Sequence, residues 1–413
     1  MKLEYVVNIE DLHGAAKRRI PRAAFDYFEG GVEDELGLAR NEQSFRGYRL
    51  RPRYLVDVSK VDQTAVLFGR TYASPFGVGP TAGGGYLRNG ADLMVAAAAA
   101  AANIPYVLSG LSSTSLEAVA KTAPQHAWFQ LYGAKDRKIS EDMVRRANEA
   151  GLNGLMVTVD APVFTKRERE LRSRLFESSM PLRNYIEALR HPAWLIAYLW
   201  HGSPVFENWV PYFEPGASAK AIFQMVRTQF PVDNQTWHDL ATFRRLWPRT
   251  LVIKGILHPD DAARAADQGV DGIVISNHGG RQLDRAPTAL EVLPSIRAVV
   301  GDRVTVMIDG GVRRGADIVI GWALGARFVF VGRALVYGVG AFGLPGAKHA
   351  IAILQKEIEL TLKQIGCTSL NQLGPEFLNA ARVPSASTSV KGCPLDQYDP
   401  GLLAISTPLT DQP

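Results

Sequence analysis

The chain has 413 residues, of which 46% are hydrophobic and 21% are charged, and its net charge is +5. This composition is typical of a soluble globular protein with a large core. The basic excess is small for this length and argues only weakly for polyanionic partners, so we expect no nucleic acid as a partner.

Three absences narrow the class further. The first residues, from Met1 to Asn8, lack the apolar segment of a signal peptide, and no apolar run approaches the length of a membrane span. Cys367 and Cys393 form neither a disulfide framework nor a metal-ligand spacing. We therefore expect a cytoplasmic protein without a metal site.

A long extension, residues 1–74, comes first and opens with a helix that Asn8 is expected to cap. Eight short apolar runs follow, each ending in polar or glycine residues, and several are separated by helical patterns. The runs are 75–79, 105–109, 128–132, 155–160, 251–255, 272–276, 304–309 and 328–332. The clearest helical patterns are 92–102, 140–150, 259–268 and 317–324. Eight strand–helix units predict an α/β protein with a (β/α)₈ TIM barrel, rather than an open doubly wound sheet.

An insert, residues 161–237, lies between the fourth and fifth predicted strands and is far longer than an ordinary connection. It contains a basic cluster from Lys166 to Arg174, and then Trp194, Trp200 and Trp209 among leucines. Such a segment can be a lid, a membrane-interface segment, or a surface that packs on the barrel or a neighbouring subunit. After it, residues up to 380 complete a single predicted domain, and the tail 381–413 is predicted to be disordered.

The active site of a parallel barrel forms at the carboxyl ends of its strands, so polar residues at these ends are candidates. They are Gln130, Tyr132, Thr158, Asp160, Lys254, Ser276, His278, Arg281, Asp309, Arg313 and Arg333. So many charged groups converging on one pocket are costly without a function. Gly310, Gly311 and Gly332 beside the last two arginines predict a phosphate site.

One glycine pattern and one histidine can each be interpreted in two ways. Gly338 to Gly343 matches G-x-G-x-x-G, but no strand leads directly into it and no acidic residue follows at the right spacing. We interpret it as a loop or a close helix contact. His278 stands at a strand end within the segment 276–284, which favours a catalytic base, whereas the other histidines are expected to be structural.

These segments resemble those of a known family. Residues 276–284, 309–315, 128–132 and 25–27 are similar to the FMN-dependent 2-hydroxy acid dehydrogenase/oxidase family, and the resemblance spans roughly residues 8–380. Within the insert, 191–194 and 201–202 resemble the bacterial (S)-mandelate and L-lactate dehydrogenases. This resemblance implies FMN, a homo-oligomer such as a homotetramer, and peripheral contact of the insert with the inner face of the cell membrane.

The resemblance also implies roles for individual residues. The implied FMN contacts are Pro80, Thr81, Ala82, Ser109, Gln130, Thr158, Lys254, Ser276, Asp309, Gly310, Gly311, Val312, Arg313, Gly332 and Arg333. The implied substrate-facing residues are Tyr27, Tyr132, Arg167, His278 and Arg281, with Asp160 as the partner of His278. Arg281 and Arg167 would clamp a carboxylate, and His278 would accept either the Cα or the hydroxyl proton.

The implied reaction is oxidation of an (S)-2-hydroxy acid to the 2-oxo acid, with electrons passing through FMN to a quinone or O₂. Residues 83–85 are all glycine and position 111 is a leucine, where glycolate oxidase-like sequences carry bulkier side chains. We therefore expect a mandelate-like substrate first and L-lactate second. Two alternatives stay open: an FMN-dependent isomerase or other phosphate-binding barrel enzyme without net redox chemistry, and a non-catalytic flavin-binding scaffold.

Overall fold

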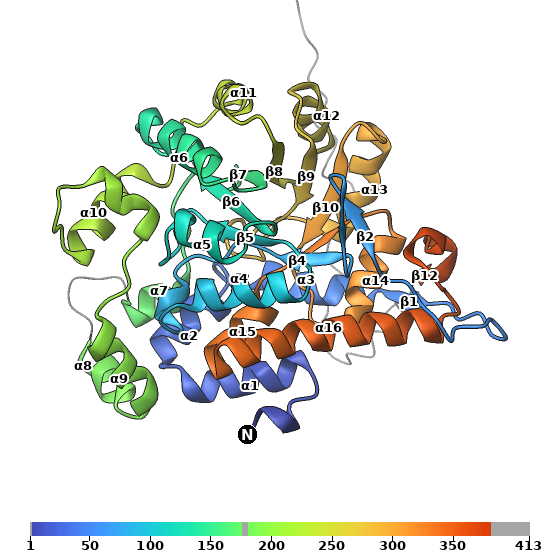
Figure 1. Ribbon diagram of the computed structural model, residues 1–413, viewed down its shortest axis with the longest axis horizontal. Coiled ribbons are helices and arrows are strands. Elements are labelled where there is room, and N and C mark those ends of the chain that lie inside the picture. The colour runs from blue at the N-terminus through green and yellow to red at the C-terminus, as the bar shows by residue number, and fades with distance from the viewer. Residues whose placement is uncertain (1, 176–180, 381–413) are drawn as a thin grey trace, which may run out of the picture.

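A closed barrel of eight parallel strands forms the centre of the computed structural model, which describes residues 2–175 and 181–380 (Figure 1). The strands are β4 (Phe76–Val78), β5 (Tyr106–Ser109), β6 (Ala127–Tyr132), β7 (Gly154–Thr158), β8 (Thr250–Ile256), β9 (Gly272–Ile275), β10 (Thr305–Asp309) and β11 (Val329–Val331). They pair in chain order, and β11 closes the ring against β4. The predicted (β/α)₈ fold is confirmed, and all eight predicted strands are present.

Helices follow the strands and pack around the barrel. They are α4 (Ala91–Ala101), α5 (Leu116–Thr122), α6 (Arg137–Glu149), α11 (Trp237–Leu246), α12 (Pro259–Asp267), α13 (Ala289–Val300), α14 (Gly315–Ala323), α15 (Arg333–Phe342) and α16 (Leu344–Gln364). Helix α6 begins three residues before the predicted start, because the Asp136 side chain caps it by accepting from the Lys138 N–H.

The G-x-G-x-x-G pattern lies in a helix pair, as one of the two interpretations predicted. Gly338 is within α15, and Gly346 is at the start of α16. A Cβ atom on Gly346 would lie 2.0 Å from the Gly338 carbonyl oxygen, so only glycine allows the two helices to approach this closely.

The N-terminal extension packs against outer helices of the barrel and ends in small strands. It comprises a 3₁₀ turn (Leu3–Tyr5), α1 (Ile9–Arg19), α2 (Arg22–Glu29), α3 (Leu36–Arg46), β1 (Tyr48–Leu50), β2 (Ala65–Leu67) and β3 (Arg70–Tyr72). The Asn8 side chain accepts from the Asp11 N–H at 2.8 Å, so the predicted cap is confirmed. Strand β1 pairs with β12 (Leu378–Ala380) near the end of the described chain, after two 3₁₀ turns (Leu370–Gln372 and Pro375–Phe377).

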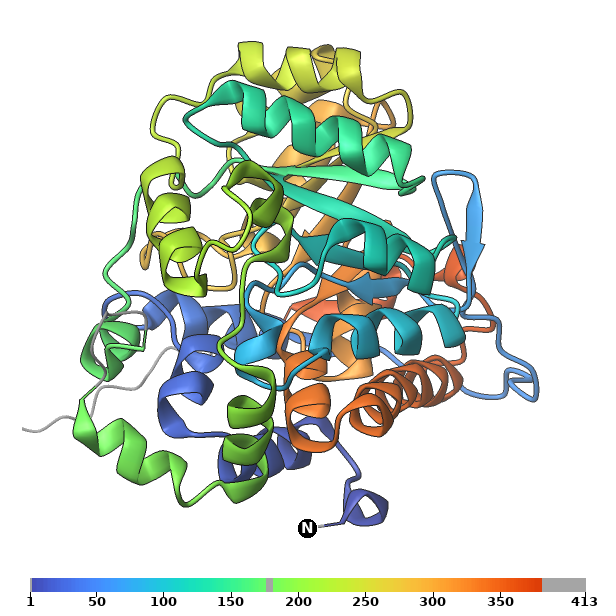
Figure 2. The ribbon, with the colours of Figure 1, turned by 60° about the vertical axis from the view of Figure 1, so that its left-hand side comes forward.

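The insert between β7 and α11 stands at one edge of the molecule (Figures 1 and 2). It contains α7 (Glu168–Ser173), α8 (Leu182–Ala188), α9 (Pro192–His201), a 3₁₀ turn (Glu207–Tyr212) and α10 (Ala219–Gln229). Trp194 and Trp209 pack toward the barrel, donating to the Tyr86 and Gly110 carbonyls at 2.9 and 3.1 Å, whereas Trp200 is 84% exposed.

Within residues 2–175 and 181–380, no helix combines the length and apolar character needed to span a bilayer. The predicted disordered tail, 381–413, lies outside the described residues.

Candidate active site

The predicted site residues converge at the carboxyl ends of the barrel strands. One pocket is lined by Tyr27, Pro80, Thr81, Ala82, Tyr132, Thr158, Arg167, Lys254, His278, Arg281, Asp309, Gly310, Gly311, Val312, Arg313, Gly332 and Arg333. The remaining four predicted residues lie behind this lining: Ser109, Gln130, Asp160 and Ser276. Strand ends distributed from β4 to β11 therefore contribute to one cavity.

The pocket contains a hydrogen-bonded histidine between an acid and a phenol. Asp160 Oδ1 lies 2.9 Å from His278 Nδ1, and the Tyr132 hydroxyl lies 3.2 Å from His278 Nε2. Because a carboxylate only accepts hydrogen bonds, the neutral ring carries its proton on Nδ1. Its Nε2 lone pair then points toward Tyr132 and the pocket, which is the arrangement that a general base needs.

The environment of this pair favours a neutral histidine beside an ionised carboxylate. Burial lowers the pKa of His278 below the usual histidine value, and the Lys254 charge lowers it further, while Asp160 opposes both. Burial would raise the pKa of Asp160, but the charges of His278 and Lys254 bring it below its ordinary value. Near neutral pH, His278 is therefore ready to accept a proton.

This electrostatic arrangement predicts the effect of Asp160→Asn. A general base works only when it is neutral, so kcat/KM should fall as pH drops through the His278 pKa, below the usual histidine range. Removing the Asp160 charge lowers that pKa again, which should move the acid limb of the kcat/KM profile to lower pH. We also expect kcat to fall by roughly a hundredfold or more, because the imidazolium loses its counter-ion.

The measurement is a pH profile of both enzymes, with Asp136→Asn as control. Asp136 is an exposed helix cap that asparagine can replace. An unchanged acid limb in Asp160→Asn would contradict the assignment of His278 as the titrating base.

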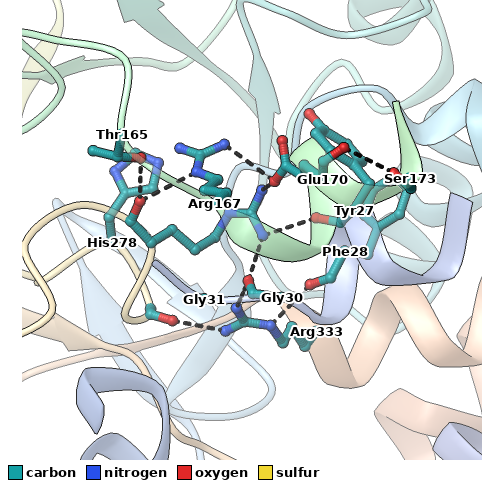
Figure 3. A network of polar contacts seen from close by, with 12 residues as sticks. Tyr27, Phe28, Gly30, Gly31, Thr165, Arg167, Glu170, Ser173, His278 and Arg333 are labelled. Atoms are coloured by element: carbon teal, nitrogen blue, oxygen red, sulfur yellow. Dashed lines mark hydrogen bonds and ion pairs between the residues drawn. The ribbon is translucent and has the colours of Figure 1, made fainter. Parts of the chain in front are cut away.

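Arg167 and Arg281 both line the pocket, and Figure 3 shows Arg167 and Glu170 within the polar network beside it. Arg281 donates through Nη1 to the Tyr27 and Gly30 carbonyls at 2.8 and 2.7 Å, and through Nη2 to Glu170 Oε1 at 2.9 Å. The Arg167 Nε donates to the Arg281 carbonyl at 3.2 Å, and its Nη1 lies 3.6 Å from the same Glu170 oxygen. The structure thus brings the two arginines together, each held by protein groups, while their role as a carboxylate clamp stays a prediction.

Glu170 is the residue that sequence reasoning missed. It lies on α7 in the insert, three residues after Arg167, and its side chain is 15% exposed. The signal available was this i,i+3 spacing, which places an acid beside a base on one helix face. What the spacing does not reveal is that the same carboxylate also reaches Arg281, 111 positions along the chain.

Lys254 occupies the base of the pocket. Its ammonium lies 3.3 Å from Asp309 Oδ2 and donates to Ser276 Oγ at 3.0 Å. Burial would lower the pKa of Lys254, but Asp309 and Asp160 raise it above its usual value, so the side chain keeps its charge. A buried permanent cation here can stabilise negative charge on a bound group.

The predicted phosphate region lies at the ends of β10 and β11. Gly311 has φ +80°, and a Cβ there would lie 2.1 Å from the Asn41 carbonyl oxygen, so the turn requires glycine. Arg313 pairs with Glu42 at 2.9 Å. Arg333 starts α15 and donates to three backbone carbonyls, which belong to Phe28, Gly30 and Gly279. Burial lowers the pKa of Arg333 to about 10, which leaves it positively charged at neutral pH.

Five buried side-chain atoms in and behind this pocket have no hydrogen-bond partner within the described residues: Gln130 Nε2, Thr158 Oγ1, Asp160 Oδ2, Gln282 Oε1 and Asp309 Oδ1. Buried polar groups are almost always paired, so these atoms indicate a polar ligand that completes them. A flavin ring with donors and acceptors along its edge fits Gln130 and Thr158, and an anionic phosphate fits the turn beside Arg313.

The expectation that residues 83–85 and Leu111 give a roomier pocket does not hold for Gly84 and Gly85, which are not among the lining residues, whereas Leu111 lines the pocket. A Cβ on Gly84 would lie 2.8 Å from Asp92 Oδ1, and one on Gly85 would lie 2.9 Å from the Pro204 Cβ. These glycines are needed because the insert and α4 pack tightly against this loop, a contact that composition alone does not reveal.

The comparisons with known proteins agree with this geometry. A model of the family described as FMN-dependent dehydrogenase matches residues 16–380. A putative L-lactate dehydrogenase of Mycobacterium tuberculosis is 40% identical, and the match covers 92% of this chain and 91% of that protein. (S)-mandelate dehydrogenase of Pseudomonas putida is 39% identical, with 90% and 93% covered.

A solved structure agrees as well. The crystal structure of monotopic membrane protein (S)-mandelate dehydrogenase superimposes with a TM-score of 0.87 at 38% identity, covering 91% of this chain and all of that one. Both comparisons confirm the resemblance predicted from the sequence. The chain therefore belongs to the FMN-dependent dehydrogenase family, as an oxidoreductase that acts on 2-hydroxy acids with FMN as its cofactor.

Proposed function

We propose that the protein oxidises an (S)-2-hydroxy acid to the 2-oxo acid, with a mandelate-like substrate preferred over L-lactate. The observation that carries this proposal is the His278–Asp160 pair, which faces the same pocket as the Arg167 and Arg281 clamp. A base beside a carboxylate clamp suits a substrate that has its hydroxyl next to a carboxylate. Leu111 at the pocket wall leaves room for a substituent larger than hydrogen.

Each residue has a defined task in this proposal. Arg281 and Arg167 hold the carboxylate, and Tyr27 lines the same side of the pocket. Tyr132 donates to the substrate hydroxyl or to the oxyanion that develops there. His278 Nε2 takes the proton, and Asp160 stabilises the resulting imidazolium.

The cofactor is proposed to lie on the other side of the pocket. Gln130, Thr158 and Lys254 would hold the flavin ring, with the backbone of 80–82 and the Ser109 and Ser276 hydroxyls around it, while the turn 309–313 and the Gly332–Arg333 backbone would hold the ribityl chain and phosphate. When bound, FMN supplies the two-electron acceptor for the oxidation. The Lys254 charge would offset negative charge on the reduced ring.

The insert is proposed to dock on the inner face of the cell membrane and to favour a quinone over O₂ as the final acceptor. Seven large apolar side chains of α8, α9 and the turn after α8 are more than half exposed: Leu182, Tyr185, Ile186, Leu189, Ile196, Leu199 and Trp200. Several exposed apolar side chains on two consecutive helices suit the headgroup boundary. The related protein described as monotopic is a precedent for such membrane attachment. We also propose that residues 1–380 act as one domain and assemble as a homo-oligomer.

The test is anaerobic mixing of the purified holoenzyme with (S)-mandelate, L-lactate and glycolate, following flavin absorbance at roughly 450 nm. We expect bleaching, with kcat/KM highest for (S)-mandelate. A glycolate preference would overturn the substrate assignment, and a flavin that no 2-hydroxy acid bleaches would favour an isomerase or a non-catalytic scaffold. Comparing O₂ uptake with reduction of a quinone analogue then identifies the acceptor.

A further inference from the structure

Helix α3 of the N-terminal extension packs against two loops of the candidate active site at once. One of them is the His278 loop, residues 276–284. The Gly37 N–H, in the first turn of α3, donates to Asp284 Oδ1 at 2.9 Å. A Cβ on Gly280 would lie 2.4 Å from a backbone nitrogen of α3, so only glycine allows this approach. The helix therefore lies directly on the loop that carries the predicted base.

A reciprocal amide pair joins α3 to the residue before His278. Asn41 Nδ2 donates to Asn277 Oδ1 at 2.8 Å, and Asn277 Nδ2 donates to Asn41 Oδ1 at 2.9 Å. The two residues are 2% and 3% exposed. The Asn277 side chain also accepts from the Gly280 N–H and donates to the Pro287 carbonyl, both at 3.2 Å. The Asn277 amide thus ties its own loop together, and Asn41 holds that amide in place.

The backbone of the His278 loop needs such support. The φ angles of His278, Gly279 and Gly280 are +59°, +64° and +74°, so three consecutive residues lie in the left-handed region. This conformation is uncommon for a residue with a side chain, and it persists only where the surrounding contacts determine it. The orientation of the imidazole toward Asp160 and Tyr132 follows from this backbone.

The same residue of α3 supports the predicted phosphate turn, residues 309–313. The Asn41 carbonyl oxygen is the atom that a Cβ on Gly311 would meet at 2.1 Å. The next residue, Glu42, pairs with Arg313 at 2.9 Å. The side chain of Asn41 therefore contacts the His278 loop, while its backbone packs against the turn after β10.

We infer that Asn41 is a positioning residue for both proton transfer and cofactor retention. Its amide pair with Asn277 fixes the loop that presents His278, and its backbone fixes the turn that is proposed to hold the FMN phosphate. Asn41 is not among the residues that line the pocket, so it acts through its neighbours rather than on the substrate. This inference rests on the proposed function, because it assigns Asn41 to the base and the cofactor named there.

The first test is Asn41→Asp, which keeps the shape of the side chain but removes the N–H donor to Asn277. At neutral pH two acceptors would then face each other, and the His278 loop would shift. We expect the rate at which the best 2-hydroxy acid of the panel above reduces the flavin of the holoenzyme to fall by roughly tenfold or more, because a misplacement of about 1 Å can cost about a hundredfold. Release of FMN from the diluted holoenzyme, followed by the fluorescence of free flavin, should be faster.

The pH dependence separates positioning from a general loss of structure. As pH falls, the introduced carboxyl takes up a proton and regains an O–H donor for Asn277, and burial favours this protonation. The ratio of the variant's rate to that of the unaltered enzyme should therefore rise toward low pH. The neighbouring ionisable groups, Glu42 with Arg313 and Asp284 with its Gly37 contact, are common to both enzymes and cancel in this ratio. A ratio that stays constant with pH would overturn the inference.

Two further variants complete the test. Asn41→Leu removes the pair without adding charge, so the rate should be lowered and FMN release faster, without recovery at low pH. Gln43→Glu makes the same amide-to-carboxylate change at an exposed position of α3, and it should match the unaltered enzyme in both measurements. Thermal unfolding of the holoenzymes verifies folding, and the pH ratio of Asn41→Asp decides alone if Asn41→Leu does not fold.

The outcomes distinguish this inference from the proposed function. If the Asn41 variants reduced their flavin as fast as the unaltered enzyme, Asn41 would not position His278, and the proposed function would stand without it. Unchanged release of FMN would overturn the cofactor half of the inference. If no 2-hydroxy acid reduced the flavin of the unaltered enzyme, the proposed function itself would fail.

Discussion

Replacing His278 with asparagine is expected to lower kcat by about three to four orders of magnitude while FMN stays bound. His278 Nε2 faces the pocket beside the Tyr132 hydroxyl, and its Nδ1 is held by Asp160 at 2.9 Å. Asparagine cannot accept the substrate proton at this position, whereas the groups proposed to hold the flavin are left unchanged. The measurement combines single-turnover flavin reduction with the FMN content of the purified variant.

Asparagine is a better choice than alanine because of the backbone. His278 has φ +59°, in the left-handed region where asparagine is several times more common than most residues. The matched control is His258→Asn, since His258 caps α12 and asparagine caps helices well. Turnover within tenfold of the unaltered enzyme in His278→Asn would exclude His278 as the base.

Replacing Arg281 with methionine is expected to lower kcat/KM by roughly a thousandfold. Removing one partner of a buried charge pair costs about 2–5 kcal/mol, and the substrate carboxylate would lose this partner. The loss should also lower the thermal stability, because the carbonyls of Tyr27 and Gly30 and the carboxylate of Glu170 lose their shared donor. Steady-state kinetics and thermal unfolding of the holoenzyme measure the two effects.

Two further variants make this test specific. Arg281→Lys keeps the charge but not the planar fork, so it should recover part of the lost kcat/KM and remain well below the unaltered enzyme. Arg285→Met removes an exposed arginine four residues further along and should change little. An Arg281→Met enzyme with an unchanged KM and kcat would show that the carboxylate is held elsewhere.

The barrel was predictable because buried parallel strands are continuous apolar runs, and their ends carry the polar residues that chemistry needs. Gly272–Ile275 is fully buried and leads directly to Ser276 and His278. The apolar run therefore predicts the buried core, and the polar residues at its end predict the active site. The same reasoning places Lys254 on β8 and Asp309 on β10 at the same rim of the barrel, where the two side chains form an ion pair of 3.3 Å.

Contacts that depend on the placement of the insert could not be predicted. Glu170 reaches Arg281 only because α7 folds back beside α2, and Gly85 is confined by Pro204 of the insert. A second cavity beside the catalytic pocket arises in the same way, since its walls combine Leu111 with Phe206 and Val226. Hydrophobic periodicity in the sequence predicts a helix, but it does not predict against which distant surface that helix packs.

Glu170 positions the two arginines of the proposed clamp and also sets the net charge of the group. Two arginines and one glutamate carry one net positive charge, which a single carboxylate neutralises. A second carboxylate within reach of the clamp would leave one negative charge uncompensated in a partly buried space, which is unfavourable. If Arg167 and Arg281 bind the substrate carboxylate as proposed, this charge balance would disfavour short dicarboxylic acids irrespective of their size.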